Sequence, residues 1–250
     1  PGVCKNNSQY YINTWHGIGP FKKIGLDLNH NSSDPERVMR YVRDNGMFDL
    51  KLAASDDCVY MYRHSQRYNG EIMKSGYPRN DIFFKKSDIG LRVREHLGIQ
   101  RDQKIVLYAP TFRGNFYLSD DSFKYYDLNL LEVKNVLEQR FSSEFIVLYR
   151  LHRYLRESGK YNSLKNVGLD VTDYCDVQEL LAASDVLITD YSSLMWDFSL
   201  MKRPVFLYQN DVEEYSIHRG FYADPKEWPY PSATDAEALR ECIISFDEDD

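Results

Sequence analysis

The sequence predicts an α/β fold in which parallel sheets are covered on both faces by helices. Short apolar runs alternate with amphipathic segments along most of the chain, and Gly, Pro and Asn punctuate the boundaries. Buried parallel strands are typical of such runs, and the alternation is typical of layered α/β domains. The stretch 75–81 interrupts both periodicities, so we predict two domains, 1–78 and 79–250.

The first domain begins with an expected strand at 10–15, which ends in a Gly- and Pro-rich loop at 16–20. A helix is predicted over 35–44, because Ser33 or Asp34 can cap it and Pro35 suits a first turn. A strand at 50–54 and a polar helix at 56–68 follow.

The second domain shows the alternation more clearly. A helix at 86–97 ends at Gly98. The final helix is predicted at 234–244, with Thr234 as N-cap and Glu237 completing a capping box. Between them we expect strands at 104–109, 145–150, 167–171, 185–189 and 204–208, and helices at 128–141, 176–183 and 193–201.

Composition excludes several classes of protein. The net charge of −7 indicates no overall attraction to nucleic acid or to an anionic membrane. The four cysteines are widely spaced, which favours a reduced, cytosolic environment and no cysteine metal site. No apolar run approaches the ~18 residues of a membrane-spanning helix. Because the chain begins at Pro1 and not at Met, we expect it to be a piece of a longer polypeptide.

Common catalytic motifs are absent. The sequence contains neither a G-x-x-x-x-G-K-[ST] loop nor a G-x-G-x-x-G loop, which argues against an NTPase and a classical dinucleotide enzyme. It also lacks H-E-x-x-H and G-x-S-x-G, which lowers the odds of a zinc protease or an α/β-hydrolase.

Polar clusters follow four of the expected strands. The carboxyl ends of parallel strands share one edge of a sheet, where ligands bind, so the last three clusters should converge, while the first belongs to the other domain. Two such edges that face each other would suit a nucleotide-diphosphate donor and an acceptor. A helix N-terminus after the last cluster suits phosphate, although N-capping alone also explains its serines. The clusters are His16 with Gly17, Thr111 with Arg113, His152 with Arg153, and Thr189 and Asp190 with Ser192 and Ser193.

Seven stretches, in order along nearly the whole chain, form a recognisable set of motifs. They are 14–17 with 22–25, 76–81, 107–113, 173–180, 188–193, 202–204 and 219–222. Together they resemble blocks of the CDP-glycerol glycerophosphotransferases, the wall teichoic acid primases and polymerases. Phe112 stands where that family usually has Trp, and Ile18-Gly19 replaces a single Thr, which shifts Lys22 by one position.

The resemblance implies a GT-B fold, with two Rossmann-like domains, an active site between them and a first domain that is incomplete here. It also implies transfer of glycerol phosphate from CDP-glycerol to a hydroxyl of a lipid-linked teichoic-acid-like or capsule polymer, with release of CMP. No cofactor or protein-bound metal is required, although Mg²⁺ on the diphosphate stays open. Such an enzyme would lie in the cytoplasm at the inner face of the bacterial membrane, touching it through its acceptor and through regions outside this chain.

Two histidines are the expected catalytic residues. His16 is the general base for the acceptor hydroxyl, and His152 stabilises the leaving CMP. Each also has a structural alternative, as a loop or strand-edge histidine.

The remaining site residues are expected to bind the donor. Arg113 would clamp a phosphate and Lys22 would balance charge, and for both the alternative is a solvated surface cation. Asp190 would orient backbone or a glycerol hydroxyl, because a carboxylate repels a diphosphate. Ser192, Ser193 and Thr189 are assigned to the diphosphate, Asp197 and Glu179 to ribose or glycerol hydroxyls, and Gly17 and Asp176 to the donor site in general.

Three other functions stay open at this point. The donor is CDP-ribitol in the first, and the chain is a GT-B nucleotide-sugar glycosyltransferase in the second. In the third, it is a catalytically silent fragment that binds the nucleotide. No nucleic-acid partner is expected.

Overall fold

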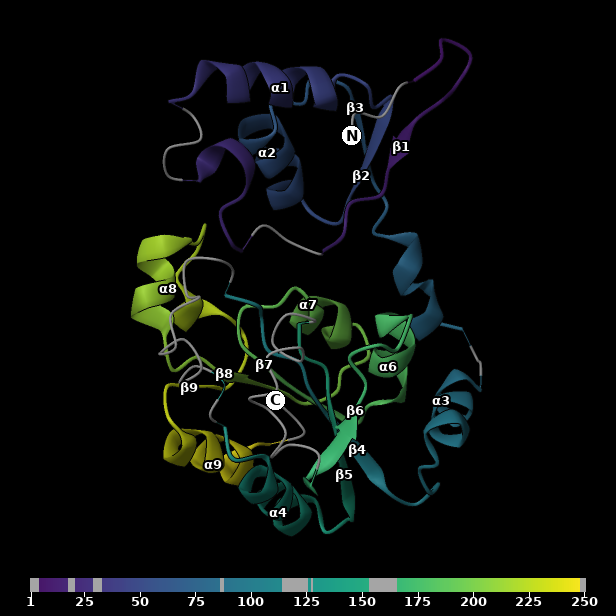
Figure 1. Cartoon of the computed structure of the whole chain (residues 1–250), viewed down its shortest axis with the longest axis vertical. Helices are drawn as coiled ribbons and strands as arrows, with labels where there is room; N and C mark the ends of the chain where they lie inside the picture. Colours follow the sequence, from purple (N-terminus) through teal and green to yellow (C-terminus); the bar gives the residue numbers. More distant parts are fainter. Residues whose placement is uncertain are drawn as a thin grey trace. The chain divides into compact units, whose positions relative to one another are not determined.

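Two parallel sheets organise the chain, one in each of two units (Figure 1). The structure is a computed structural model, and it describes residues 5–17, 21–28, 33–85, 88–113, 126, 128–152 and 166–247. The first unit comprises Pro1–Asp81 and Glu213–Glu227, and the second comprises Ile82–Val212 and Trp228–Asp250. All strand pairs within the two sheets are parallel, so the expected α/β fold with parallel sheets is confirmed.

The sheet of the first unit has the order β1-β2-β3. Its strands are β1 (Ile12–Asn13), β2 (Leu50–Ala53) and β3 (Glu71–Lys74), and its helices are α1 (Pro35–Asn45) and α2 (Asp56–Ser65), with short 3-10 turns at Gly25–Asp27 and Pro78–Phe83. Asp34 caps α1 as expected, because its side chain accepts from the N–H groups of Glu36 and Arg37. The strand expected at 10–15 shrinks to two residues, and β3 was not predicted.

A buried lysine lies at the centre of this unit. Lys51 on β2 is only 1% exposed, and its ammonium donates to Asn45 Oδ1 and to Gln66 Oε1. Burial lowers the pKa of Lys51 to about 7. The Nζ atom lies 4.8 to 5.0 Å from the ring centroids of Phe48, Tyr62 and Tyr68.

The sheet of the second unit has the order β6-β5-β4-β7-β8-β9. The chain starts this sheet in the middle, at β4, proceeds outward to β6, and then returns to β7 on the other side of β4. The strand order therefore reverses between β4 and β7, and in open α/β sheets ligands bind outside the carboxyl ends of the strands at such a point. The strands are β4 (Lys104–Tyr108), β5 (Phe145–Tyr149), β6 (Gly168–Asp170), β7 (Val186–Thr189), β8 (Val205–Tyr208) and β9 (Ser232–Ala233).

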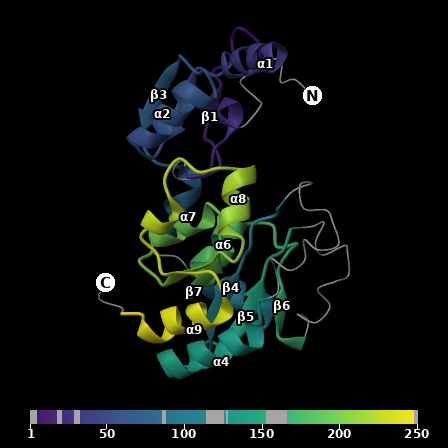
Figure 2. The same cartoon turned by 90° about the vertical axis from the view of Figure 1, so that its left-hand side faces the viewer.

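Helices cover both faces of this sheet (Figure 2). On one face, α4 (Leu130–Phe141) and α9 (Ala236–Ser245) pack on a continuous core of alternate strand residues, Val106, Val147 and Ile188 among them. On the other face, α6 (Val177–Ala183) packs against β4 and α3 (Ile89–Leu97), while α7 (Leu194–Ser199) packs against β7. The strands are therefore buried on both sides, as their apolar runs predict.

Two details at the end of the chain differ from the prediction. The N-cap of α9 is Asp235, whose side chain accepts from the Ala238 N–H, so Thr234 was the wrong cap and the expected capping box is not formed. The helix α8 (Val212–His218) and the short strand β9 were not predicted.

The segment Glu213–Glu227 returns to the first unit. Lys22 pairs with Phe221 in an antiparallel bridge, and the Tyr222 hydroxyl donates to Asp27 Oδ2 at 2.6 Å. These contacts join parts of the chain that are far apart in sequence. Glu213–Glu227 therefore belongs to the first unit, whereas the predicted boundary at 78 placed it in the second domain. The inserted Ile18-Gly19 and the predicted Arg153 lie outside the described residues.

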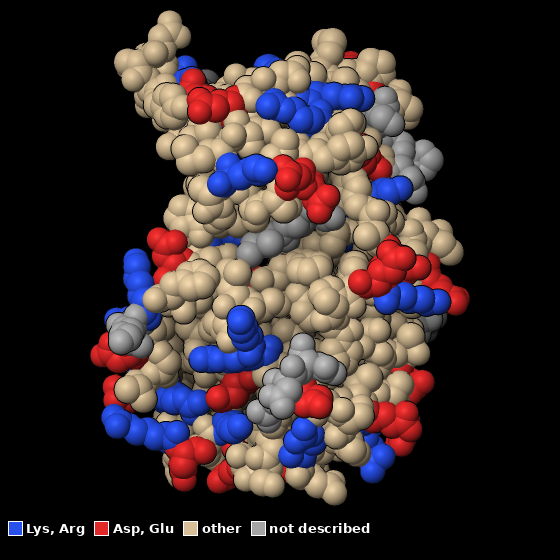
Figure 3. Space-filling model, turned by 180° about the vertical axis from the view of Figure 1, so that it is seen from behind, with Lys and Arg blue, Asp and Glu red and all other residues tan. Residues whose placement is uncertain are grey.

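The surface carries both signs of charge. On the face seen in Figure 3, basic and acidic residues are interspersed. No helix in the described part of the chain is long and apolar enough to cross a membrane.

Candidate functional site

The carboxyl ends of β4 and β7 meet where the strand order reverses. Both Asp190 carboxylate oxygens accept from the Thr111 N–H, at 2.9 and 3.0 Å, which ties the loop after β7 to the loop after β4. The Tyr191 N–H also donates to Asp190 Oδ1. Asp190 therefore orients the backbone of both strand-end loops, and its carboxylate is 3% exposed.

Arg113 belongs to the segment that follows β4 and is almost fully buried. Its guanidinium pairs with Asp190 at 2.5 Å and with Asp211 at 2.7 Å, and it also donates to the Thr111 carbonyl. Burial on its own would lower the pKa of Arg113, but the two carboxylates raise it, so the guanidinium stays charged. Arg113 therefore binds other parts of the protein in this structure, whereas the sequence predicts that it binds a phosphate of the donor.

The Thr189 side chain also binds within the protein. Its hydroxyl donates to the Ala109 carbonyl at 2.6 Å, and the residue is 1% exposed. The expected contact between Thr189 and a diphosphate is therefore not supported by its orientation. Thr111 differs, because its buried Oγ1 has no hydrogen-bond partner among the described residues.

Ser192 and Ser193 are the half-exposed residues of the same loop. Ser193 occupies the N-cap position of α7, yet its side chain makes no capping hydrogen bond. The Ser192 hydroxyl accepts from the Leu194 N–H at a long 3.4 Å. Capping therefore does not account for Ser193, and its hydroxyl stays available to a ligand at the switch point.

His152 follows β5, the neighbour of β4. Its exposed ring stacks on Phe112 with centroids 4.0 Å apart and an interplanar angle of 13°. Phe112 in turn follows β4, so the structure brings the loops after β4, β5 and β7 to one edge of the sheet, as expected.

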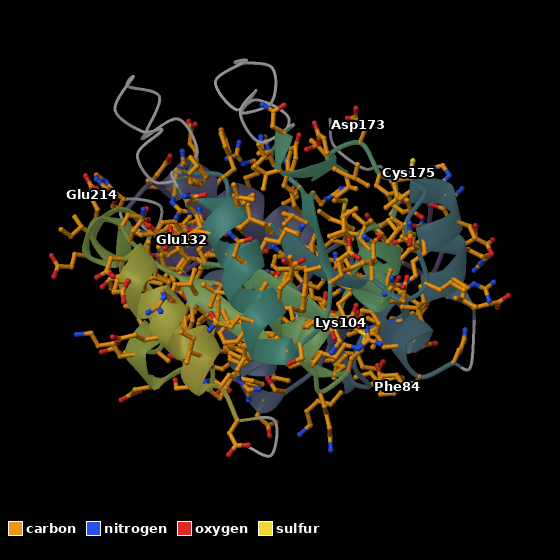
Figure 4. The ribbon with its side chains drawn as sticks, turned by 90° about the horizontal axis from the view of Figure 1, so that it is seen from below. Phe84, Lys104, Glu132, Asp173, Cys175 and Glu214 are labelled. Atoms are coloured by element: carbon orange, nitrogen blue, oxygen red, sulfur yellow. The ribbon has the colours of Figure 1, made fainter. Side chains whose placement is uncertain are left out.

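The three remaining acidic residues lie on or next to α6 and α7. Asp176 caps α6 through the Gln178 N–H, and Glu179 accepts from the Tyr174 hydroxyl at 2.8 Å. Asp197 is buried and accepts from the Gln178 side chain at 3.1 Å, which ties α7 to α6. Asp176 and Glu179 lie on the connection that follows β6, whose Asp173 is labelled in Figure 4, well away from Lys104 at the opposite end of β4.

In the first unit, His16 and Gly17 directly follow a strained residue. Trp15 has φ of 54°, which is rare for a bulky side chain, and its N–H donates to Asn13 Oδ1. The Trp15 ring packs edge-on against Tyr62 with centroids 5.8 Å apart. The Trp15 ring also contacts the His16 ring, with centroids 4.2 Å apart; His16 is exposed and Gly17 is buried. Strained backbone of this kind clusters at functional sites.

The surroundings of His16 favour its neutral form. Partial desolvation of the ring lowers the pKa of His16, and the positive charges of Arg79 and Lys22 lower it further. A neutral imidazole can accept a proton, which is what a general base requires. Lys22 is half-buried, with its ammonium 5.2 Å from the Phe21 ring centroid.

Sequence reasoning missed Arg79 and Asp211 at these sites, and it placed Thr111 in a strand-end cluster without giving it a role. Arg79 and Thr111 lie within the stretches 76–81 and 107–113, so their positions in these motifs could have indicated a functional role. Asp211 had no such signal, because its contact with Arg113 joins residues 98 positions apart. Among the described residues, no three His, Cys, Asp or Glu side chains are grouped so that they could hold a metal ion.

The comparisons with known proteins agree with one another. A family model described as CDP-Glycerol:Poly(glycerophosphate) glycerophosphotransferase matches residues 1–250. The teichoic acid poly(glycerol phosphate) polymerase of Bacillus spizizenii is 32% identical over 249 residues, which cover 96% of this chain and 62% of that protein. The teichoic acid glycerol-phosphate transferase of Staphylococcus aureus is 32% identical over 258 residues, which cover 98% of this chain and 64% of that protein.

Solved structures show the same relationship. A variant of the wall teichoic acid polymerase TagF superposes with a TM-score of 0.79 at 29% identity, covering 97% of this chain and 60% of that chain. A TagF variant soaked with CDPG superposes with a TM-score of 0.76 at 28% identity and covers 97% of this chain. This likeness confirms the expected GT-B-type fold. The chain spans less than two thirds of the length of each of these relatives.

Proposed function

We propose that this chain, which belongs to the CDP-glycerol:poly(glycerophosphate) glycerophosphotransferase family, transfers glycerol phosphate from CDP-glycerol to a hydroxyl of a teichoic-acid-like polymer and releases CMP. The observation that carries this proposal is the edge between β4 and β7. Three side chains lie there, at the point where the strand order of the doubly wound sheet reverses. They are Ser192, Ser193, whose hydroxyl makes no capping hydrogen bond, and the exposed His152.

The donor diphosphate binds at this edge in our proposal. The hydroxyls of Ser192 and Ser193 donate to its oxygens, and His152 in its protonated form offsets the charge that develops on CMP as it leaves. Arg113 and Asp190 do not touch the donor and instead keep the loop in place. Asp176 and Glu179 contact the donor's hydroxyls from the connection after β6.

His16 acts as the general base. The acceptor oxygen attacks the phosphorus that carries glycerol, and the bond from that phosphorus to the CMP oxygen breaks. The acceptor's proton passes to the neutral His16 imidazole, while the negative charge leaves with CMP. Lys22 offsets part of the donor's charge on this side. The step needs no resident metal, and Mg²⁺ that arrives with the diphosphate is compatible with it.

The acceptor in this proposal is a lipid-linked polymer at the inner face of the bacterial membrane. The chain would act from the cytoplasm and reach the membrane through that acceptor and through parts of the protein outside this chain.

CDP-ribitol is the second donor to test. The teichoic acid ribitol-phosphate primase of Bacillus spizizenii is 31% identical over 254 residues, nearly as similar as the glycerol-phosphate relatives. A change of donor would keep every role above and alter only the contacts to the polyol hydroxyls.

Calorimetric titration tests the donor site. We expect CDP-glycerol to bind in preference to CDP-ribitol and to a UDP-sugar, and His152→Ala and Ser193→Ala each to weaken binding about tenfold. His64→Ala, which removes an exposed imidazole stacked on Tyr60 elsewhere in the chain, is the matched control and should bind normally. Selective binding of the UDP-sugar would overturn the proposal. Selective binding of CDP-ribitol would mean that the chain transfers ribitol phosphate and builds a ribitol-phosphate polymer.

Release of CMP in the presence of a glycerol-phosphate acceptor tests the chemistry. His16→Ala should keep the affinity for CDP-glycerol and lower the rate by about 10² to 10⁴. If the variant kept the parent rate, His16 would not be the base. If the parent bound donor but released no CMP with an acceptor, the chain would be a nucleotide-binding piece only.

A further inference from the structure

Asp211 is buried in the turn that follows β8, and the proposed reaction assigns it no contact with donor or acceptor. Both of its carboxylate oxygens accept from Arg113, with Nε to Oδ2 at 2.7 Å and Nη2 to Oδ1 at 2.9 Å. Neither side chain is more than 2% exposed. A bidentate pair of this kind fixes the direction as well as the distance between its partners.

The same carboxylate also holds Tyr191. The hydroxyl of this fully buried tyrosine donates to Asp211 Oδ1 at 3.0 Å. The Arg113 guanidinium lies over the Tyr191 ring, with its carbon 5.0 Å from the centroid. Asp211 therefore fixes Tyr191, which belongs to the loop after β7, and Arg113, which in turn holds Asp190 of the same loop.

That loop is fixed at each residue that precedes the two serines. Asp190 is held by Arg113 through its side chain, and its carbonyl accepts from Gln209 Nε2 at 3.3 Å. Tyr191 is held by Asp211 at its hydroxyl. Ser192 and Ser193 come next and are the first half-exposed residues of the loop. Their direction therefore depends on the buried contacts that Asp211 makes.

We propose that Asp211 is a positioning residue for donor binding, which acts through Arg113 and Tyr191 to hold the Ser192 and Ser193 hydroxyls toward the diphosphate. This inference rests on the proposed function of the strand-end loop. It predicts that the buried carboxylate controls donor affinity although it does not touch the donor.

The chain provides a matched control at the other end of the same strands. Asp185, just before β7, pairs with Arg94 at 3.1 Å and accepts from the Ile105 N–H on β4 at 2.8 Å. This ion pair ties β4, β7 and α3 at the amino-terminal edge of the sheet, near the Lys104 labelled in Figure 4. Its loss should destabilise the unit without reaching the serine loop.

The test compares Asp211→Asn with Asp185→Asn. We expect both to lower the unfolding midpoint, whereas only Asp211→Asn should weaken CDP-glycerol binding in calorimetry, by about tenfold. Tyr191→Phe removes one hydrogen bond and no charge, so we expect this variant to fold and to bind CDP-glycerol about threefold more weakly. This second variant decides the test if Asp211→Asn does not fold. Parent-like affinity in Tyr191→Phe and in folded Asp211→Asn, or equal weakening in Asp185→Asn, would overturn the proposal.

Amide exchange separates this inference from the proposed function. In Asp211→Asn and in Tyr191→Phe, the amides of residues 191–195 should exchange faster than in the parent, while Asp185→Asn should leave them unchanged. If the parent itself did not bind CDP-glycerol, the proposed function would fail, and exchange at 191–195 would still show whether Asp211 positions the loop. Unchanged exchange in both loop variants would overturn the positioning role.

Discussion

Partial burial and two neighbouring positive charges determine the protonation of His16. Desolvation, Arg79 and Lys22 all lower the pKa of His16 below its usual value of 6.5. The imidazole is therefore neutral at physiological pH, and it takes up a proton only as the pH falls through the lowered pKa. A reaction that uses His16 as base should keep its rate near neutral pH and lose it on the acid side.

Arg79 provides a test of this electrostatic effect. Removing its positive charge raises the pKa of His16, so Arg79→Gln should move the acid limb of the kcat/KM profile toward higher pH. Arg63→Gln is the matched control, because Arg63 belongs to the same unit and lies over the Tyr68 ring without acting on His16. The measurement is CMP release across the pH range. Acid limbs that coincide in the parent and Arg79→Gln would rule out His16 as the titrating base.

At the residue scale, sequence predicts which residues gather but not what they contact. The strand-end positions of Thr189, Asp190 and Ser193 followed from the apolar runs before them. The burial of Arg113 did not, because the two carboxylates that pair with it, Asp190 and Asp211, lie 77 and 98 positions away. Lys51 was equally hidden, since its aromatic surroundings come from separate elements of the first unit.

At the element scale, the cap of α1 and the apolar strand runs were predicted correctly, whereas the capping box expected at Thr234 and the strand β3 were not. Asp34 and Pro35 mark the start of α1, and the apolar runs mark β4, β5 and β7. The strand β3 was missed because Glu71–Lys74 shows no clean alternation and carries a charge at each end. Such composition is typical of edge strands, which use charge to discourage pairing with other chains.

The pairing of β6 with β5 depends on a glycine. A Cβ added at Gly168 would lie 2.3 Å from the Val147 carbonyl oxygen on β5, a backbone atom that cannot move aside. Gly168→Ala should therefore push β6 away and lower the free energy of unfolding by about 2 kcal/mol. It should also weaken donor binding, because Asp176 and Glu179 lie on the connection that β6 begins.

Gly90→Ala is the control for this prediction. A Cβ at Gly90 in α3 would meet its nearest atoms at 3.7 and 3.8 Å, which is ordinary contact. Alanine also has the higher helix propensity, so this variant should be neutral or slightly more stable in urea unfolding. If Gly168→Ala unfolded at the same urea concentration as Gly90→Ala, the close approach of β6 to β5 would be wrong.

At the scale of the whole molecule, the path of the chain between the two units is the feature that sequence could not predict. The chain leaves the second unit after Val212 and returns to it at Trp228. Nothing in residues 213–227 signals this excursion, because its cause is pairing with distant residues. Lys22 pairs with Phe221, and Tyr222 bonds to Asp27 across 195 positions of sequence.

The path of the chain predicts that residues 213–227 unfold locally together with the first unit. Tyr222→Phe removes the hydrogen bond to Asp27 and should lower the stability of the first unit by about 1 kcal/mol. In amide exchange, residues 213–227 should then lose protection together with α2, since they belong to one cooperative unit. The elements β8 and α9, which flank the segment in sequence, should keep the protection of the parent. Equal loss of protection in β8 and α9 would mean that the segment opens with its sequence neighbours and not with the first unit.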